Sequence, residues 1–140
     1  MRVVIDTNVF IATCFGSQAP GEVLAECIKG TLVPLMGSAL LAEYESVLGR
    51  PDLFRSARLD ARQREDLLDI FLASCQWVQI YFLWRPNLRD EADNHVLELA
   101  IAGGAHWIVT RNVRDFAAPM LRFPDLQIGP PEAVLKEIAS

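Results

Sequence analysis

The feature that most constrains the fold of this chain is a short apolar run near its start that ends directly in a carboxylate. Residues 2–6 have the sequence Arg-Val-Val-Ile-Asp, and Thr7 and Asn8 follow. Three consecutive β-branched aliphatic residues between polar ones are typical of a buried strand. Ligands of open α/β sheets bind beyond the carboxyl ends of the strands. The run therefore predicts a central strand that places Asp6 at a functional edge.

Strands and helices alternate along the rest of the chain. Apolar runs predict further strands over residues 32–36, 77–82, 106–110 and 127–128. Helical periodicity, with Pro and Gly as boundaries, predicts helices from about residue 9 to Gly16 and over about 20–29, 38–48, 60–74, 90–103 and from Pro131 onward. Ser38 is the expected N-cap of one helix, and Asp60 with Gln63 resembles a capping box at another. The alternation predicts an α/β fold with a mostly parallel sheet of four to five strands, flanked by helices and connected by right-handed crossovers.

The length and composition of the chain fit one compact unit. With 140 residues, 51% of them hydrophobic, we expect a single domain over residues 1–140. No stretch approaches the roughly 18 to 20 uninterrupted apolar residues that cross a bilayer. We therefore expect no signal peptide, no membrane span and a cytoplasmic protein.

The cysteines and histidines follow no ligand pattern. Cys14, Cys27 and Cys75 are odd in number and widely spaced, so they are predicted to be reduced core thiols, with a catalytic thiol as the alternative that no motif supports. His95 and His106 lack metal-ligand spacing and are interpreted as structural. The chain also has no glycine-rich phosphate loop, no nucleophile elbow and no zinc-binding HExxH helix.

The positive charges are concentrated even though the net charge is −5. The thirteen lysine and arginine residues include only two lysines. The planar guanidinium of arginine can donate two parallel hydrogen bonds to a phosphate, which lysine cannot. Five arginines gather within residues 50–64: Arg50, Arg55, Arg58, Arg62 and Arg64. This segment is either a solvated helix face with its approach loop or a phosphate-binding surface, in which Arg50 and Arg55 would contact RNA.

Three further clusters of polar and acidic residues fall at predicted element ends or edges. They are Glu43 with Glu45, then Asp90, Glu91, Asp93 and Asn94, and finally Asn112 with Asp115. If these clusters converge with Asp6, they form a carboxylate pocket suited to a hard divalent cation. Thr7, Asn8 and Thr110 could orient a carboxylate or a metal-bound water, although all three are also common turn residues.

Each acid also has a purely structural interpretation. Asp6 could cap the next helix through an amide near Asn8 or Val9. Asp93 lies in a first helical turn, where the macrodipole stabilises a carboxylate by about 0.3–1 kcal/mol. Glu43 and Glu45 border opposite edges of the apolar stripe on their helix, so helical geometry does not choose between them. Arg111 and Arg114 could meet phosphate or balance nearby acids.

Four motifs together resemble the PIN domain family, in its group of toxins from toxin–antitoxin systems. In chain order they are VVIDTNVFI (residues 3–11), LLAEYE (40–45), DEADNHVLELA (90–100) and IVTRNVRDF (108–116). The match extends over nearly the whole chain with the right order and spacing. The resemblance implies a Rossmann-like sheet and a ribonuclease that hydrolyses RNA phosphodiester bonds with Mg²⁺, for which Mn²⁺ could substitute.

The resemblance also implies a set of ligands and partners. The acids of the family map onto Asp6, Glu43 and Asp93, which selects Glu43 over Glu45. The family's fourth acid often stands where this chain has Asn112, so Asp115 is the alternative ligand. The expected partners are the RNA substrate, an antitoxin protein that covers the acidic pocket, and a second copy of the chain in a homodimer or higher homo-oligomer.

Two competing interpretations remain at this point. Loss of the fourth acid at Asn112 would fit a catalytically weakened PIN-like module that binds RNA or protein. A phosphorylatable receiver domain would have a Lys after a late strand, whereas here Arg111 follows Thr110. Metal binding and nuclease activity distinguish the first alternative from a ribonuclease.

Overall fold

The structure, a computed structural model, describes residues 1–80, 91–116 and 123–140, with the backbone alone at residues 91–94. Within these residues, five strands form one sheet in the order β3-β2-β1-β4-β5, and every adjacent pair is parallel. The strands are β1 (Arg2–Ile5), β2 (Val33–Met36), β3 (Gln76–Trp77), β4 (Trp107–Val109) and β5 (Gln127–Gly129). The predicted α/β fold with a parallel central sheet is confirmed.

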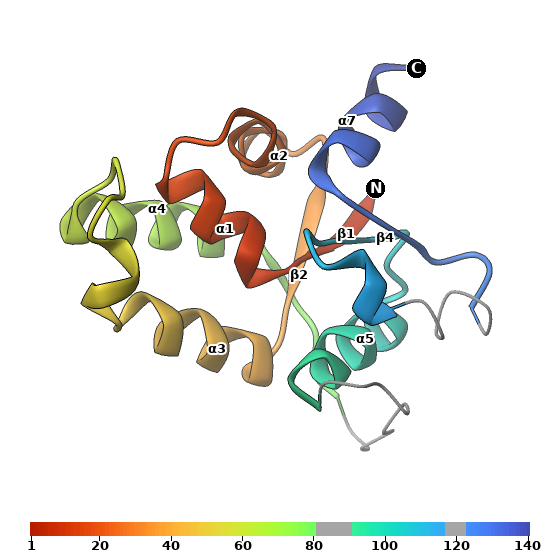
Figure 1. The fold of residues 1–140 in the computed structure, drawn as a ribbon. Coiled ribbons are helices and arrows are strands. Elements are labelled where there is room, and N and C mark those ends of the chain that lie inside the picture. Colours follow the sequence, from red (N-terminus) through yellow and green to blue (C-terminus); the bar gives the residue numbers. More distant parts are fainter. Residues whose placement is uncertain (81–90, 117–122) are drawn as a thin grey trace.

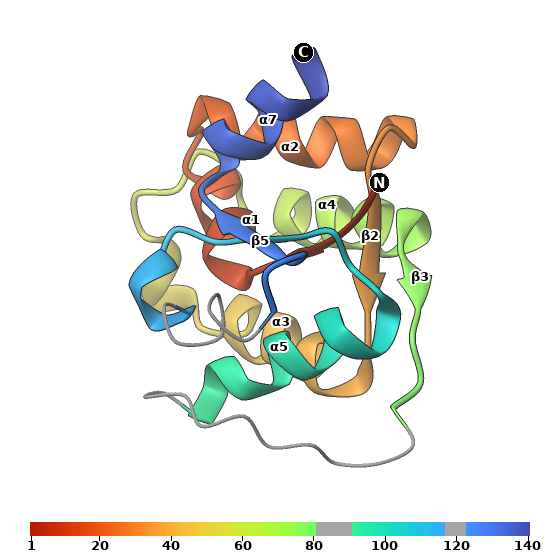
Figure 2. The same cartoon turned by 90° about the vertical axis from the view of Figure 1, so that its right-hand side faces the viewer.

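Helices cover both faces of this sheet (Figures 1 and 2). They are α1 (Thr7–Cys14), α2 (Gln18–Lys29), α3 (Ser38–Leu48), α4 (Ala61–Ser74), α5 (Glu91–Gly103) and α7 (Pro131–Ala139), with short 3-10 helices η1 (Pro51–Phe54) and η2 (Val113–Phe116). Helix α5 packs on β1, β2 and β4 from one side, while α7 packs on β4 and β5 from the other. Across the described ranges, no helix combines the length and the apolar character that crossing a bilayer requires.

The apolar run at the start of the chain becomes the centre of this arrangement. Val3, Val4 and Ile5 are all buried in β1, which lies between β2 and β4. A parallel strand with both faces covered needs apolar side chains on both sides, which explains the unbroken aliphatic run. Polar residues are thereby confined to the point where the strand ends.

The carboxyl ends of the strands meet at one edge because all the strands run in the same direction. Ile5 of β1 is paired with Val109 of β4. The next residue on each strand is Asp6 and Thr110, so the register places these two polar side chains next to one another. The sheet itself thus assembles the first part of the candidate site.

Some element boundaries differ from those expected. Helix α1 begins at Thr7 rather than near residue 9, immediately after β1. Gly37 rather than Ser38 is the N-cap of α3, at a position where a Cβ atom would lie 3.3 Å from Leu99 Cδ1. Strand β3 ends at Trp77 instead of residue 82, because its partner β2 ends at Met36; residues 81 and 82 lie outside the described part.

Candidate functional site at the carboxyl edge of the sheet

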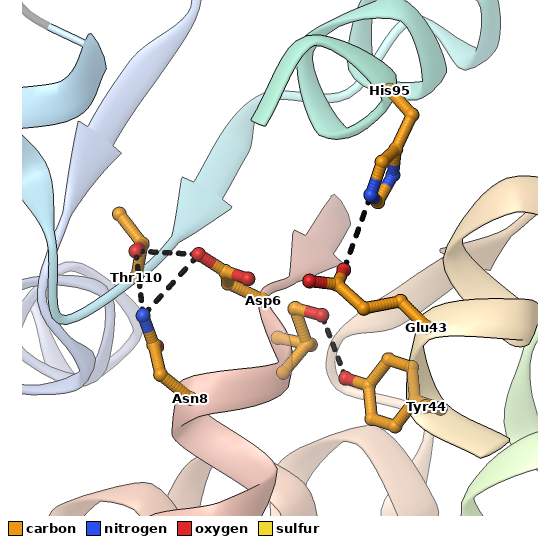
Figure 3. Close-up of polar contacts among 7 residues, drawn as sticks. Asp6, Asn8, Glu43, Tyr44, His95 and Thr110 are labelled. Atoms are coloured by element: carbon orange, nitrogen blue, oxygen red, sulfur yellow. Dashed lines mark hydrogen bonds and ion pairs between the residues drawn. The ribbon is translucent and has the colours of Figure 1, made fainter. Parts of the chain in front are cut away.

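Asp6 is held by side chains from two other segments (Figure 3). Thr110 Oγ1 donates a hydrogen bond to Asp6 Oδ2 over 2.8 Å, and Asn8 Nδ2 lies 3.3 Å from the same oxygen. The backbone N–H of Asn112 donates to Thr110 Oγ1 over 3.0 Å, which leaves the hydroxyl proton of Thr110 for Asp6. Oδ2 of Asp6 is therefore held by two side chains, and the backbone N–H of Thr7 also donates to the carboxylate.

The structure excludes the alternative in which Asp6 caps a helix. Asp6 occupies the N-cap position of α1, but its side chain makes no capping hydrogen bond. The amide of Val9 donates instead to the backbone carbonyl of Asp6, over 3.0 Å. The alternative of a side-chain cap is wrong, and Oδ2 of Asp6 accepts from Thr110 and Asn8 instead.

Burial makes the charge of Asp6 unfavourable. Asp6 is only 5% exposed, and this burial is the largest cause of a pKa raised above the ordinary value of 3.8. The negative charge of Glu43 raises the pKa further, while the hydrogen bond from Thr110, the backbone of Thr7 and the nearby His95 lower it. Among the described side chains, an ionised Asp6 therefore lacks a full counter-charge.

Glu43 is brought to Asp6 by its neighbour in the sequence. Tyr44 is fully buried, and its hydroxyl donates to the carbonyl of Ile5 over 2.7 Å. Because Ile5 precedes Asp6 and Glu43 precedes Tyr44, this bond places the two acids at the same point of the sheet edge. Glu45 is exposed on α3, so of the two open alternatives the geometry favours Glu43.

The second contact of Glu43 is with His95 of α5. Nε2 of His95 lies 3.2 Å from Oε2 of Glu43, and the two side chains are 18% and 29% exposed. Oε2 is buried, and no hydrogen bond of good geometry reaches it in the described part of the chain. Sequence reasoning treated His95 as structural and missed this contact, whose only signal was its position two residues after Asp93.

The second oxygen of Asp6 and the second oxygen of Glu43 are directed at one another. Figure 3 shows Oδ2 of Asp6 turned toward Thr110 and Oε2 of Glu43 turned toward His95, with the remaining oxygen of each acid pointing into the space between them. Two facing anions in a largely buried position repel each other unless a cation lies between them. Paired carboxylate oxygens are the donors that Mg²⁺ and Mn²⁺ prefer, so this pair fits a hard divalent cation.

For Asp93, the third predicted acid, the structure gives only the backbone position in α5. Asp93 and Asn94 lie in the first turn of α5, and their side chains lie outside the described part of the structure, as does Asp90. The backbone of Asp93 is about 3 Å along the helix axis from that of His95. Among the side chains that are described, no three His, Cys, Asp or Glu residues lie close enough to hold a metal ion together.

Among the described contacts, neither candidate for the fourth ligand, Asn112 or Asp115, bonds directly to Asp6 or Glu43. Asn112 is exposed and reaches the site through its backbone amide, which bonds to Thr110. Asp115 lies half-buried in η2, and within the described residues its carboxylate makes no hydrogen bond or ion pair with Asp6 or Glu43. The choice between Asn112 and Asp115 stays a prediction.

The two arginines after β4 border the site from outside. The backbone N–H of Arg111 donates to Asn8 Oδ1 over 3.1 Å, and both Arg111 and Arg114 are exposed. Arg111 also lines a cavity of about 370 Å³ that residues 17–20 and 130–132 complete. Arg111 thus lies next to Asn8, one of the residues that orient Asp6.

The arginine-rich segment lies at the opposite end of α1 from Asp6 (Figure 1). The backbone N–H of Arg58 donates to the carbonyl of Cys14, the last residue of α1, which places it about 12 Å along the helix from Asp6. Arg50 and Arg55 are exposed there. Arg64 is instead buried: its guanidinium lies 4.2 Å above the Phe54 ring and donates to the carbonyl of Leu59.

The cysteines are free thiols packed among apolar side chains. Cys14 and Cys27 are buried and Cys75 is half-buried. Burial raises the pKa of Cys14 to about 11 and those of Cys27 and Cys75 to about 12. Thiols that stay protonated at neutral pH are poor nucleophiles. The prediction of reduced core thiols is confirmed.

Comparison with known families shows the classification of the chain. A family model described as PIN domain matches residues 2–114, which is well over half of the sequence and includes Asp6, Glu43 and Asp93. The chain belongs to the PIN domain family. The resemblance expected from the four motifs is thereby confirmed.

A solved structure shares this PIN fold. It is the crystal structure of VapBC2 from Rickettsia felis bound to a DNA fragment from their promoter, and the similarity covers 91% of this chain and 97% of that chain. The TM-score is 0.57 and the sequence identity is 19%, so the likeness is one of fold. No curated protein matched the sequence.

Proposed function

We propose that this PIN domain, extending over residues 1–140, is an endoribonuclease that hydrolyses RNA phosphodiester bonds with Mg²⁺, for which Mn²⁺ can substitute. The facing carboxylates of Asp6 and Glu43 are the observation that carries the proposal. Membership of the PIN family supports it, because PIN domains are generally nucleases that use divalent metals. Asp93 is the proposed third ligand, and Asp115 or Asn112 supplies the fourth.

The residues of the chain have distinct tasks in this proposal. A bound divalent ion supplies Lewis-acid activation of water and neutralises the phosphate charge, which favours in-line displacement without a covalent protein intermediate. Thr110 and Asn8 hold Asp6 in one orientation, with Thr7 contributing its backbone N–H. Burial of Asp6 keeps water from screening its charge.

The arginines at the rim supply the affinity for RNA. Arg111 and Arg114 are exposed beside the carboxylate pair, where they can contact the phosphates that flank the cleaved bond. Arg50 and Arg55 extend this contact along the far end of α1. The net charge of −5 does not oppose RNA binding at the site, because bound cations reverse the local sign.

The biological role that fits best is the toxin of a toxin–antitoxin pair in the cytoplasm. The motif set supports this role, as does the shared fold with a chain of the VapBC2 complex. The antitoxin would cover the acidic pocket, for example by inserting a basic side chain, and the toxin would form a homodimer. Growth arrest on expression that disappears with Asp6→Asn tests toxicity; arrest that persists with this variant contradicts it.

Cleavage by purified variants tests the enzymatic proposal. Asp6→Asn and Asp93→Asn keep the size of the side chains and remove one negative charge each. We expect them to lower Mg²⁺-dependent RNA cleavage by at least about 100-fold, since each removes a metal ligand. Glu45→Gln, on the exposed face of α3, is the matched control and should cleave like the wild type. Undiminished cleavage by both aspartate variants would refute the proposed site.

One observation favours the alternative of a non-catalytic binding module. Asn112, at the position where PIN relatives often have an acid, is exposed and neutral. Mn²⁺ titration followed by calorimetry separates the two functions. A protein that neither binds Mn²⁺ nor cleaves any of several RNAs is a binding module rather than a ribonuclease.

A further inference from the structure

Each acid of the pair has one oxygen engaged by a side chain from another element. Oδ2 of Asp6 accepts a hydrogen bond from the Thr110 hydroxyl, which follows β4. Glu43 has Oε2 facing Nε2 of His95, which lies in α5. In Figure 3 Thr110 and His95 stand on opposite sides of the pair. In this arrangement the remaining oxygen of each carboxylate faces the space between the two acids.

From this arrangement we propose that His95 is a positioning residue for Glu43. It fixes Oε2 over the 3.2 Å contact, so that the remaining oxygen of Glu43 stays directed toward Asp6. The inference rests on the proposed metal site and names the residue that pre-organises one of its two described ligands. Residues that contact a metal-binding carboxylate and orient it strongly affect metal affinity without touching the ion.

The proposed role of His95 requires a particular position of the hydrogen on its imidazole. An ionised carboxylate is only an acceptor, so the nitrogen that faces it must carry the proton. In neutral His95 this is the tautomer with hydrogen on Nε2. Nδ1 is buried and has no hydrogen-bond partner in the described part of the chain.

His95 is unlike a metal ligand in its orientation. Its Nε2 is turned toward Glu43 rather than into the space between the carboxylates. Glu43 is also more constrained along α3 than an exposed glutamate, because Tyr44 beside it is fully buried. The remaining freedom of Glu43 is rotation of its own side chain, and this is what the His95 contact restricts.

Mn²⁺ binding to the metal-free protein, measured by calorimetry at one pH, tests the inference. His95→Phe keeps a ring of similar size but lacks the donor, and we expect it to weaken Mn²⁺ affinity by about 10-fold. His95→Gln places an amide N–H near the position of Nε2 and should recover most of the loss. His106→Gln is the matched control, since His106 lies at the opposite end of β4 and contacts Arg2; it should bind like the wild type. Affinity that is unchanged in His95→Phe and lost in Glu43→Gln would overturn the positioning role.

An NMR measurement separates failure of this inference from failure of the proposed function. Long-range proton–nitrogen spectra of the metal-free protein at alkaline pH should show hydrogen on Nε2 of His95 in the wild type, and a mixture of tautomers in Glu43→Ala. Hydrogen on Nδ1 in the wild type would overturn the inference. If the wild type binds no Mn²⁺, the proposed function is wrong. The position of the hydrogen on His95 then tests the contact with Glu43 independently of any metal. Nitrogen coupling from His95 in the EPR spectrum of bound Mn²⁺ would make it a ligand and also overturn the positioning role.

Discussion

At the scale of single residues, the charge of Asp6 opposes folding while no cation is bound. Below pH 3.8 the carboxyl is protonated in the unfolded and folded chain alike. As pH rises, the unfolded chain loses the proton first, because burial raises the pKa of the folded carboxyl. The folded state then binds more protons than the unfolded state, so its stability falls until Asp6 itself ionises and stays lower above that pH. Burial of the ionised Asp6, with Glu43 beside it, thus lowers the stability of the metal-free fold.

Asp6→Asn should therefore stabilise the metal-free protein at neutral pH. The amide oxygen can still accept from Thr110 and Asn8, and the amide N–H₂ then faces Glu43 in place of a second anion. Thermal unfolding in EDTA should give a higher melting temperature for the variant than for the wild type. The difference should grow as pH rises from about 3.8 through the raised pKa of Asp6. A variant that is less stable than the wild type at neutral pH contradicts this account of Asp6.

Thr110→Val should disturb the anchor of Asp6 without changing the shape of the buried side chain. Thr110 is fully buried, and the change removes one donor to Asp6 Oδ2 and the acceptor of the Asn112 N–H. Asn8 still donates to Oδ2 of Asp6. Because the Thr110 bonds are lost, we expect a loss of about 1–3 kcal/mol in the free energy of unfolding, measured in urea, together with weaker Mn²⁺ binding. Thr13→Val removes a hydroxyl that only bonds back to Val9 within α1, so it serves as the control. Equal effects of the two substitutions would show that Thr110 has no special role.

The residue contacts of the site were only partly predictable. Once β1 and β4 are recognised, the parallel register makes Asp6 and Thr110 neighbours. The meeting of Glu43 with His95 depends on how α3 and α5 pack, and no spacing in the sequence encodes a contact between separate helices. For the same reason, helical geometry left Glu43 and Glu45 equivalent, and only the family resemblance selected Glu43; in the fold Glu43 is half-buried and Glu45 is exposed.

At the scale of elements, an aromatic cluster fixes α3 against the end of β1. The Phe10 and Tyr44 rings meet edge to face with centroids 5.4 Å apart, and the Phe71 centroid lies 5.8 Å from that of Tyr44. These three residues join α1, α3 and α4, while the Tyr44 hydroxyl joins α3 to β1. The distance between the two acids is therefore set by packing around Tyr44.

Tyr44→Phe tests whether this packing positions the site. The ring stays, but the 2.7 Å hydrogen bond to the Ile5 carbonyl is lost, which should lower the free energy of unfolding by about 1–2 kcal/mol. Mn²⁺ affinity should fall as well, because Glu43 loses its fixed distance from Asp6. Asp60→Ala, which removes the capping box of α4, should cost about 1 kcal/mol and leave Mn²⁺ affinity unchanged. If both variants change Mn²⁺ affinity alike, the effect of Tyr44 is general destabilisation.

Local signals in the sequence predicted the elements better than their pairing. Gly30 ends α2 with φ at 94°, a conformation that glycine adopts easily, and Asp60 and Gln63 form the expected capping box. The length of β3 was overestimated, because a strand extends only as far as its partner and β2 ends at Met36. Propensity acts within a segment, whereas strand length and the true N-cap of α3 depend on neighbouring elements.

At the scale of the whole molecule, parallel strands gather the chain's scattered polar residues at one edge. The α/β class and PIN family were predictable because alternation and motif order survive in the sequence. The location of the arginine segment at the far end of α1 was not, since it depends on how the segment after α3 returns to pack against Cys14. The two short strands β4 and β5 complete the edge beside Asp6.

We propose that the facing oxygens of Asp6 and Glu43 bind a divalent cation. Crystals soaked in Mn²⁺ and measured at a wavelength with strong manganese anomalous scattering would locate this ion. We expect an anomalous peak in contact with the oxygens of Asp6 and Glu43 that face each other, with Asp93 completing the protein ligands and His95 outside them. Manganese bound elsewhere in the chain, with no peak between these two carboxylates, would contradict it.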